Sequence, residues 1–311
     1  MKKTFILSAI LFLFISLSFI EDDELKISFQ DICWSPDGKT IYFSAMKVKP
    51  DYSDFKPEKW NIYKYDFATK TTSKFIDSAY YVSVSPSGKQ IAVGKRINGN
   101  RDILIYDSNG KNPKRITTDP ADDFGATFSP DEKQIAFNSK QSGKPEIYLA
   151  NTDGSLMDNS AFAELRGSVD KYTKLRRITF SNGFSSYNPA WSPDGKYIAY
   201  YFEKGDHKDQ IRLMNPDGTN DKNITNDTLN NTFPNWIDKN KIVYAQNKKA
   251  FTLSIEEMNL QNPQPQPLNI ESFCTRFSPD GKMIAFINNK EKCIEVITAE
   301  GKPVTKIFLP D

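Results

Sequence analysis

The residue types that could carry out catalysis are sparse in this chain, which has one histidine, His207, among 311 residues. His207 lies between Lys204 and Asp209 in a polar stretch, which predicts a solvent-exposed loop, and a Ser-His-Asp triad could use no other histidine. The segment Gly183-Phe-Ser-Ser-Tyr187 only half matches the G-x-S-x-G motif and is not placed between a strand and a helix. We therefore predict no catalytic residue.

Acidic side chains are the next candidates, because carboxylates can hold a metal ion. Asp119, Asp122 and Asp123 stand close together, and Asn151-Thr-Asp-Gly-Ser155 has the composition of a turn. Neither segment completes a calcium-loop pattern. We predict no metal site and no cofactor, and interpret these acids as solvated turn residues, with a bound calcium ion as the alternative.

One short sequence motif recurs six times and is expected to organise the fold. An apolar or aromatic anchor meets a Ser-Pro-Asp-Gly-type turn, which a short apolar strand follows; the anchors are Trp34, Val84, Phe128, Trp191, Trp236 and Phe277. The fifth copy is degenerate, because Ile237-Asp-Lys-Asn240 replaces the turn. A period in the forties built of short strands is typical of a propeller. We predict an all-β fold, a six-bladed β-propeller of four-stranded antiparallel blades over residues 21–311.

The fourth copy gives the clearest frame for one blade. Residues 188–191, 196–202, 210–214 and 223–225 read as its four strands, joined by turns rich in Pro, Asp and Gly. The last blade takes all its strands from the C-terminus, so two closures of the ring stay open. Either the first and last blades pack face to face, or Leu25–Phe29 adds a strand to the last blade.

These units resemble the WD-like repeats of the TolB-type β-propeller family, above all in Trp191-Ser-Pro-Asp-Gly-Lys-Tyr-Ile-Ala-Tyr200 and in 211–225. The resemblance covers residues 24–311 and implies the fold rather than a function. TolB itself carries an α/β domain before its propeller, and only a leader and a few residues precede the first copy here. The Tol-complex role is therefore not implied. Similar propellers also precede peptidase domains or act as lyases, but the lyases use several histidines.

Aromatic side chains are the candidates for recognition. Because antiparallel strands alternate in direction, the loops after the second and fourth strands of each blade share one face. That face holds an insertion in the first blade and aromatics four positions before an anchor, or three in the case of Phe233; the candidates are Tyr52, Phe55, Trp60, Tyr80, Phe124, Tyr187, Phe233 and Phe273. They form either a binding platform around the channel or a set of wedges between blades, since positions minus four and zero share one side of an uninterrupted strand.

The first twenty residues form a separate element. Lys2 and Lys3 precede an apolar run over 5–20, which acidic residues 21–24 end. This predicts a signal peptide at 1–20 and export to the periplasm or the outside, with an uncleaved membrane anchor as the alternative. After cleavage the protein would not be an integral membrane protein.

A short helix is predicted at 161–165, in an insertion of the third blade.

Charge and cysteine content limit the partners. The chain has 41 basic and 39 acidic residues, which gives no field to favour nucleic acid. Cys33, Cys274 and Cys293 are too far apart in the predicted blades for a disulfide, so we expect small buried thiols.

We expect a non-catalytic propeller that binds a protein partner. The alternatives are carbohydrate binding, a polysaccharide- or peptide-cleaving envelope enzyme, and a rigid spacer.

Overall fold

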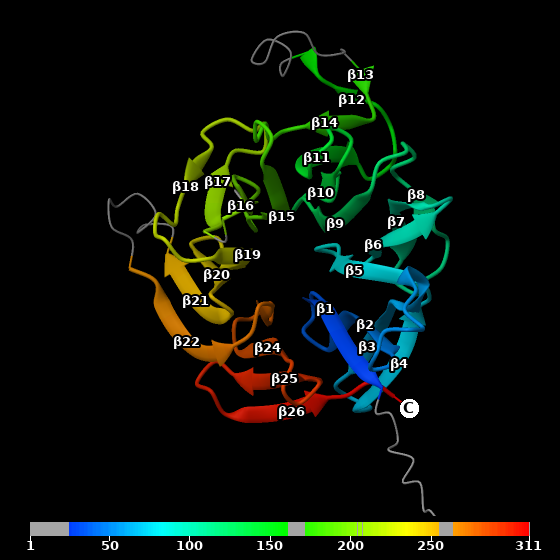
Figure 1. Cartoon of the computed structure of the whole chain (residues 1–311), viewed down its shortest axis with the longest axis vertical. Coiled ribbons are helices and arrows are strands. Elements are labelled where there is room, and N and C mark those ends of the chain that lie inside the picture. The colour runs from blue at the N-terminus through cyan, green and yellow to red at the C-terminus, as the bar shows by residue number, and fades with distance from the viewer. Residues whose placement is uncertain (1–24, 161–171, 204, 207, 255–263, 311) are drawn as a thin grey trace, which may run out of the picture.

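The computed structural model describes residues 25–160, 172–203, 205–206, 208–254 and 264–310. Six four-stranded antiparallel sheets are arranged as a ring around a central axis, as Figure 1 shows. In each sheet the strands follow their order in the chain from the centre of the ring outward. In the third blade the separate hairpin β12–β13 lies in the chain between the last two strands, β11 and β14. The predicted all-β, six-bladed propeller of four-stranded blades is confirmed.

Each blade begins with its innermost strand, here called A, and ends at the rim with D. The A strands are β1 (Lys26–Trp34), β5 (Ala79–Val84), β9 (Asp123–Phe128), β15 (Ser185–Trp191), β19 (Asn231–Asp238) and β23 (Thr275–Phe277). The B strands are β2 (Thr40–Val48), β6 (Gln90–Ile97), β10 (Gln134–Ser139), β16 (Ile198–Glu203), β20 (Lys241–Gln246) and β24 (Met283–Asn288).

The outer strands are more variable in length. The C strands are β3 (Asn61–Asp66), β7 (Asn100–Asp107), β11 (Glu146–Asn151), β17 (Gln210–Met214), β21 (Lys249–Ser254) and β25 (Cys293–Thr298). The D strands are β4 (Thr71–Ile76), β8 (Lys114–Arg115), β14 (Leu175–Arg177), β18 (Lys222–Asn223), β22 (Gln266–Glu271) and β26 (Pro303–Ile307). A small hairpin, β12 (Met157–Asp158) with β13 (Tyr172–Thr173), and a 3-10 turn, η1 (Pro57–Lys59), lie in the two insertions. The predicted helix at 161–165 lies outside the described residues.

The repeated turn is held by its own side chains. In the first copy the Ser35 hydroxyl donates to Asp37 at 2.6 Å and accepts the Thr40 amide at 2.9 Å. Gly38 takes a positive φ of 70°, which glycine adopts without strain. The hydroxyls of Ser129, Ser192 and Ser278 make the same pair of contacts. The repeated motif therefore stabilises the turn that connects strands A and B of a blade.

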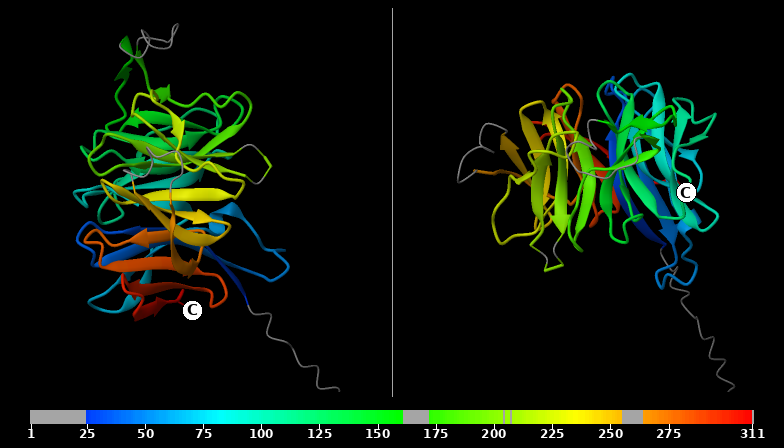
Figure 2. Two further views of the ribbon diagram at one scale, coloured as in Figure 1. Left: turned by 90° about the vertical axis from the view of Figure 1, so that its left-hand side faces the viewer. Right: turned by 90° about the horizontal axis from the view of Figure 1, so that it is seen from above.

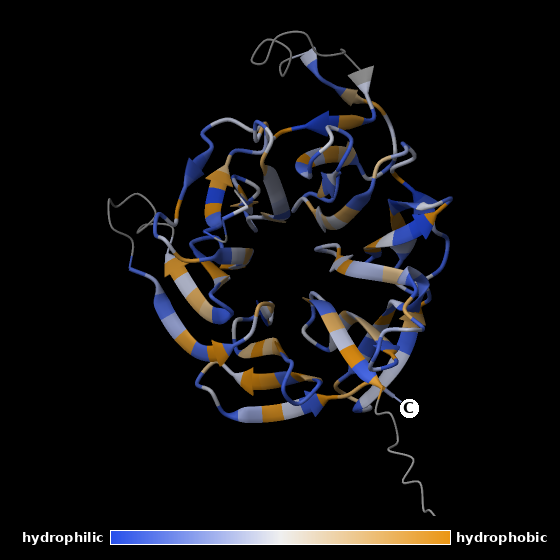
Figure 3. Cartoon of the chain, in the orientation of Figure 1, coloured by the Kyte–Doolittle hydropathy of each residue, from blue (hydrophilic) through white to orange (hydrophobic). Residues whose placement is uncertain are grey.

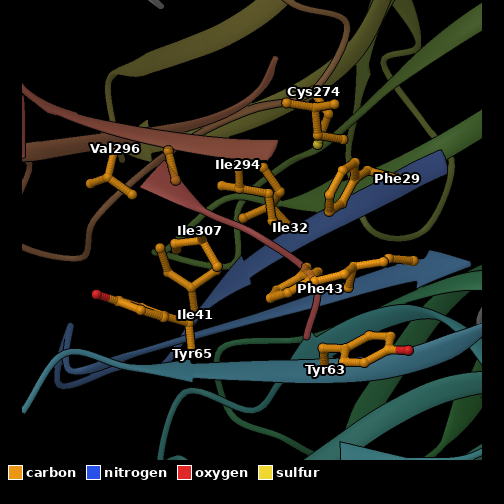
Figure 4. Close-up of a cluster of buried hydrophobic side chains, with 14 of the residues drawn as sticks. Phe29, Ile32, Ile41, Phe43, Tyr63, Tyr65, Cys274, Ile294, Val296 and Ile307 are labelled. Carbon is orange, nitrogen blue, oxygen red and sulfur yellow. The ribbon is translucent and has the colours of Figure 1, made fainter. Parts of the chain in front are cut away.

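The ring closes by face packing of the first and last blades, because β1 pairs only within the first sheet. Figure 4 shows the apolar cluster at this junction, where Phe29 and Phe43 meet Cys274, Ile294 and other side chains of the last blade. The Trp34 indole N–H donates to the Arg276 carbonyl at 3.2 Å across the same junction. The alternative in which Leu25–Phe29 joins the last blade is wrong, since the hydrophobic positions of β1 are already used against β2 and the last blade.

Candidate binding face

The A strands are interrupted by β-bulges just above the channel. The pairing of β5 with β6 skips Tyr81, and that of β19 with β20 shifts between Thr232 and Asn235. The residue three before the anchor has a positive φ in four blades: Tyr81 (53°), Gly125 (66°), Asn188 (52°) and Phe233 (54°). For a bulky aromatic residue this conformation is an outlier, costing about 1–2 kcal/mol. Such strain is concentrated at functional sites in proteins.

The bulges bring aromatic rings from five blades into a continuous arc. Tyr81 stacks on Phe124 with ring centroids 5.7 Å apart, and Phe124 lies 6.4 Å from Tyr187. The chain of contacts continues from Tyr187 to Tyr201 at 5.2 Å, to Phe233 at 5.8 Å and to Phe273 at 5.4 Å. Tyr80 joins it through Tyr81 at 6.1 Å. The partial ring of aromatics expected at the channel mouth is therefore present in this structure.

Members of this aromatic arc differ in exposure. Tyr80 and Phe124 are 4% and 5% exposed, whereas Tyr187, Phe233 and Phe273 are half-buried. Phe124 lies between blades, because it contacts Tyr81 of the second blade and Tyr187 of the fourth. The argument that positions minus four and zero share one side was wrong, because a bulged residue lies between them and breaks the alternation. Sequence reasoning also missed Tyr81 and Tyr201.

Below the arc lies the channel, a cavity of about 390 Å³ between all six A strands. Asp31 of the first blade and Arg276 of the last face into it and form an ion pair of 3.1 Å. Burial raises the pKa of Asp31, and the Arg276 guanidinium opposes that rise. Burial likewise raises the pKa of Tyr81 to about 12 and the pKa of Tyr201 above its usual range. The phenols at the mouth are therefore neutral and can donate hydrogen bonds.

A cation and a group of acids flank the arc on one side. The Arg101 guanidinium lies 4.4 Å from the centroid of the Phe124 ring and pairs with Asp122 at 3.1 Å. Behind this pair, Asp102 and Asp123 are fully buried, and Asp102 pairs with Arg115 at 2.7 Å. Burial raises the pKa of Asp123 to about 7.

Those acids differ from the solvated turn acids that the sequence indicated. Asp122 is partly exposed and paired, but Asp123 is buried at the start of β9, opposite Ser139 of β10, and neither of its carboxylate oxygens completes a hydrogen bond to a described residue. Within the described part of the chain, no three His, Cys, Asp or Glu side chains are arranged to hold a metal ion.

The insertion of the first blade presents its aromatics separately. It extends from the ring between β2 and β3, beside the start of the described chain (Figure 2). Tyr52 and Phe55 are 44% and 46% exposed, and the Lys26 ammonium lies 4.3 Å from the Tyr52 centroid. Trp60 is half-buried, and among the described residues no ring contact links these three aromatics to the arc.

Of the remaining catalytic candidates, the structure describes Ser185 and the cysteines. Ser185 is buried at the start of β15, and His207 lies outside the described residues. All three cysteines are free, as predicted, with Cys274 and Cys293 buried and Cys33 half-buried. Burial raises the pKa of Cys33 to about 11 and that of Cys274 to about 12, so these thiols stay protonated and weakly nucleophilic.

The membrane question concerns residues that precede the ring. The described residues include no helix that is both long enough and apolar enough to span a bilayer. The predicted signal peptide at 1–20 lies outside them, so its export role and its cleavage stay predictions.

Comparisons with known proteins agree with this geometry. Residues 33–172 match the model of the TolB beta propeller domain. The Tol-Pal system protein TolB of Helicobacter pylori strain J99 is 32% identical over 101 residues, which cover 32% of this chain and only 24% of the relative.

Two solved structures share the fold. A protein assigned as TolB from Agrobacterium tumefaciens superposes with a TM-score of 0.61 at 19% identity, over 87% of this chain and 90% of its own. Kuenenia stuttgartiensis hydrazine synthase reaches 0.65 at 13% identity, over 91% of this chain and 46% of its own. At such identities the superpositions establish architecture alone. The sequence match over residues 33–172 and the six-bladed ring together support a TolB-type β-propeller family for this chain.

Proposed function

We propose that this chain is an exported, non-catalytic propeller that binds a protein partner on the face formed by its B–C and D–A loops. The observation that carries the proposal is the aromatic arc, because two of its members, Tyr81 and Phe233, hold a strained backbone at the channel mouth. Aromatic anchors dominate the energetics of protein interfaces, and strain that packing does not require favours a role in recognition.

Three further features support a protein partner over a small molecule. The arc, the Arg101–Asp122 pair and the exposed Tyr52 and Phe55 offer both apolar and charged contacts. A disc face of this breadth suits an interface of about 800 Å² on each side. A relative that matches part of this ring is named as a component of the Tol-Pal system, which is an assembly of proteins. We extend export and a periplasmic or extracellular location to this chain from its apolar leader and from that relative.

Binding is tested by crosslinking the purified protein to envelope extract of its own cell and identifying the captured protein by mass spectrometry. The captured protein is then purified and its affinity measured. Replacing Trp60, Tyr187 and Phe233 together by Ala should weaken that affinity at least tenfold, because each buried aromatic anchor contributes on the order of 1–2 kcal/mol or more.

A matched triple variant on the opposite face controls for general damage. Lys39, Lys196 and Lys282 are exposed in the A–B turns, and their replacement by Ala should leave the affinity within twofold of the parent. Equal affinities for both triple variants, each shown to be folded by circular dichroism, would contradict the proposal. Retention of a glycan in place of a protein would also contradict it and would favour the carbohydrate-binding alternative.

A further inference from the structure

The chain builds the same polar corner three times where it passes from one blade to the next. A threonine hydroxyl just after the D strand accepts a hydrogen bond from the amide of a C-strand isoleucine, at 3.0 Å for Thr117 and Ile103. Thr179 and Thr225 accept equivalent hydrogen bonds at 2.8 and 2.9 Å. Figure 3 shows hydrophilic residues in the loops that join the blades.

Three further side chains complete each polar corner. They belong to the residue before the C-strand isoleucine, the residue two after the threonine, and the residue five before the next anchor. In chain order the three sets are Asp102, Asp119, Asp123; Glu146, Ser181, Ser186; and Gln210, Asp227, Asn231.

The second corner satisfies its own carboxylate. Glu146 accepts hydrogen bonds from the Thr179 hydroxyl at 2.5 Å and from the amide and hydroxyl of Ser181 at 2.7 and 2.8 Å. Arg177 donates to it as well, at 2.7 Å. The hydroxyls of Ser181 and Ser186 are themselves bonded at 2.7 Å.

The third corner is also internally bonded. The side-chain oxygen of Gln210 accepts the Thr225 hydroxyl at 2.9 Å. The side-chain amide of Asn231 donates to the Asp227 carboxylate at 2.8 Å. Each of these two corners therefore contains one carboxylate and supplies it with donors.

The first corner, between the second and third blades, contains three carboxylates. Asp102 and Asp123 are both 0% exposed, and Asp102 pairs with Arg115 at 2.7 Å. The Oδ1 atom of Asp102, the Oδ2 atom of Asp119 and both carboxylate oxygens of Asp123 are buried and complete no hydrogen bond to a described residue. Carboxylates that share a buried site cannot all ionise, and a buried charge without donors is costly. This corner therefore stays closed by holding a proton.

Other charged and titratable groups around this corner are neutral or engaged. On β6, Lys95 donates to a backbone carbonyl at 3.0 Å, and Arg101 of β7 pairs with Asp122 at 3.1 Å. From the third blade, Lys140 pairs with the same Asp122 at 3.6 Å, and burial raises the pKa of Tyr148, which stays neutral. Among the described residues, the arginine of β8 is therefore the only cation paired with the three carboxylates.

The corner is directly connected to the aromatic arc. Asp123 lies between Asp122, which accepts the backbone N–H and the guanidinium of Arg101 at 3.1 Å each, and Phe124, a member of the arc. The Arg101 guanidinium lies 4.4 Å from the Phe124 ring, and the Asp122 carbonyl accepts the Lys140 amide at 3.1 Å. A shift at the start of β9 therefore disturbs both Phe124 and the cation beside it.

We propose that the corner formed by Asp102, Asp119 and Asp123 is a proton-operated switch on the aromatic arc. With the proton bound, the corner is closed and holds Phe124 and Arg101 in place. When Asp123 releases its proton to the solvent, the D–A loop lifts, water reaches the carboxylates, and the start of β9 loosens. The switch itself does not depend on a partner; its effect on partner binding rests on the proposed function.

Hydrogen–deuterium exchange of the purified protein provides the test, read by mass spectrometry at pH 5, 6, 7 and 8 and corrected for the intrinsic rate. The reporters are the amides of Arg101 and Lys140, because both donate to Asp122 and are released when the loop lifts. Burial raises the pKa of Asp123 from 3.8 to about 7. Opening should therefore become about tenfold more frequent per pH unit from pH 5 to pH 7 and then level off.

The other two corners are internal controls. The amides of Ser186 and Asn231 donate to carbonyls at the same place in those corners, each at 2.8 Å. They should stay more protected than the Arg101 and Lys140 amides at pH 7 and pH 8. Equal exchange at all three corners would indicate global unfolding and would overturn the local switch.

A pair of variants identifies the titrating group. Asp123→Asn should abolish the pH dependence of exchange at Arg101 and Lys140. Asp227→Asn replaces the carboxylate of the third corner and should leave that dependence intact. Both variants are first shown to be folded by circular dichroism. Exchange in the parent that does not change with pH, or a pH dependence that persists in Asp123→Asn, would overturn the proposal.

A second measurement separates the switch from the proposed function. Affinity for the captured partner should fall by about threefold or more between pH 5.5 and pH 7.5 in the parent, and should stay constant in Asp123→Asn. Exchange that follows the expected pH dependence with unchanged affinity would overturn the role of the arc in binding and support the switch alone. A loss of affinity that is equal in Asp123→Asn would overturn the switch and leave the proposed function standing.

Discussion

Replacing Asp123 by Asn should stabilise this propeller at alkaline pH. Asp123 is fully buried at the start of β9, and its counterparts five residues before the anchors of the next two blades are the neutral Ser186 and Asn231. Burial is the main cause of its raised pKa, and the nearby carboxylates Asp119 and Asp102 add to it. The hydroxyls of two neighbouring residues lower the pKa in part, without completing hydrogen bonds of ordinary geometry.

The magnitude follows from the difference between the folded and unfolded pKa values. The folded value is about 7 and the ordinary value is 3.8. Below about pH 4 both states are protonated and Asp123 costs nothing; as the pH rises toward 7, only the unfolded state ionises freely, and stability falls by about 1.4 kcal/mol per pH unit. The cost is complete above pH 7. Between pH 5 and pH 8 the free energy of unfolding of Asp123→Asn should therefore gain about 2–3 kcal/mol over the parent.

The assay is urea unfolding monitored by tryptophan fluorescence at pH 5, 6, 7 and 8. Asp122→Asn is the matched control, because burial raises the pKa of Asp122 but Arg101 lowers it further, to a net value below the ordinary one. That substitution should destabilise the protein by the same amount at all four pH values, because the folded and unfolded pKa values of Asp122 both lie below pH 5. A stability difference for Asp123→Asn that does not change with pH, or that has the opposite sign at pH 8, would refute the reasoning.

Two other predictions follow from buried contacts. Trp236→Phe removes the indole hydrogen bond to Ala190 and should lower the free energy of unfolding by about 1–2 kcal/mol in urea titrations, and an unchanged midpoint would contradict that role. The buried thiols of Cys274 and Cys293 should react with a disulfide reagent at pH 8 only as fast as the chain opens, and fast modification of either in the folded protein would contradict their burial.

The architecture could be predicted from the sequence because the repeated turn is local chemistry. Ser35 and Asp37 hold the turn through contacts within five residues, and the same Ser–Asp pair recurs in the third, fourth and sixth copies. A turn that depends only on neighbouring residues can be recognised from the sequence alone. The repeated turn therefore located the anchors, the blades and the five aromatics near the channel.

What the sequence could not predict depends on contacts between blades. The bulge at Tyr81 and Phe233 follows from how an A strand meets its B strand, so the parity of side chains along the strand was misjudged. Tyr201 entered the arc from a B strand, where its sequence position resembles that of any buried apolar residue. The closure of the ring likewise depended on packing between segments more than 240 residues apart.

A propeller allows its interfaces to diverge one at a time, because each blade contacts only its neighbours. Equivalent positions are therefore the informative comparison within this chain. Asp123 is a buried acid where Ser186 and Asn231 are neutral, and Phe286 is half-buried where Tyr200 is enclosed. Neither departure helps the ring to close: the acid costs stability above about pH 4, and the half-buried Phe286 forgoes apolar burial. Positions that reduce stability in one blade while their counterparts support it in others are the places where selection for binding or regulation has the clearest physical reason to have acted.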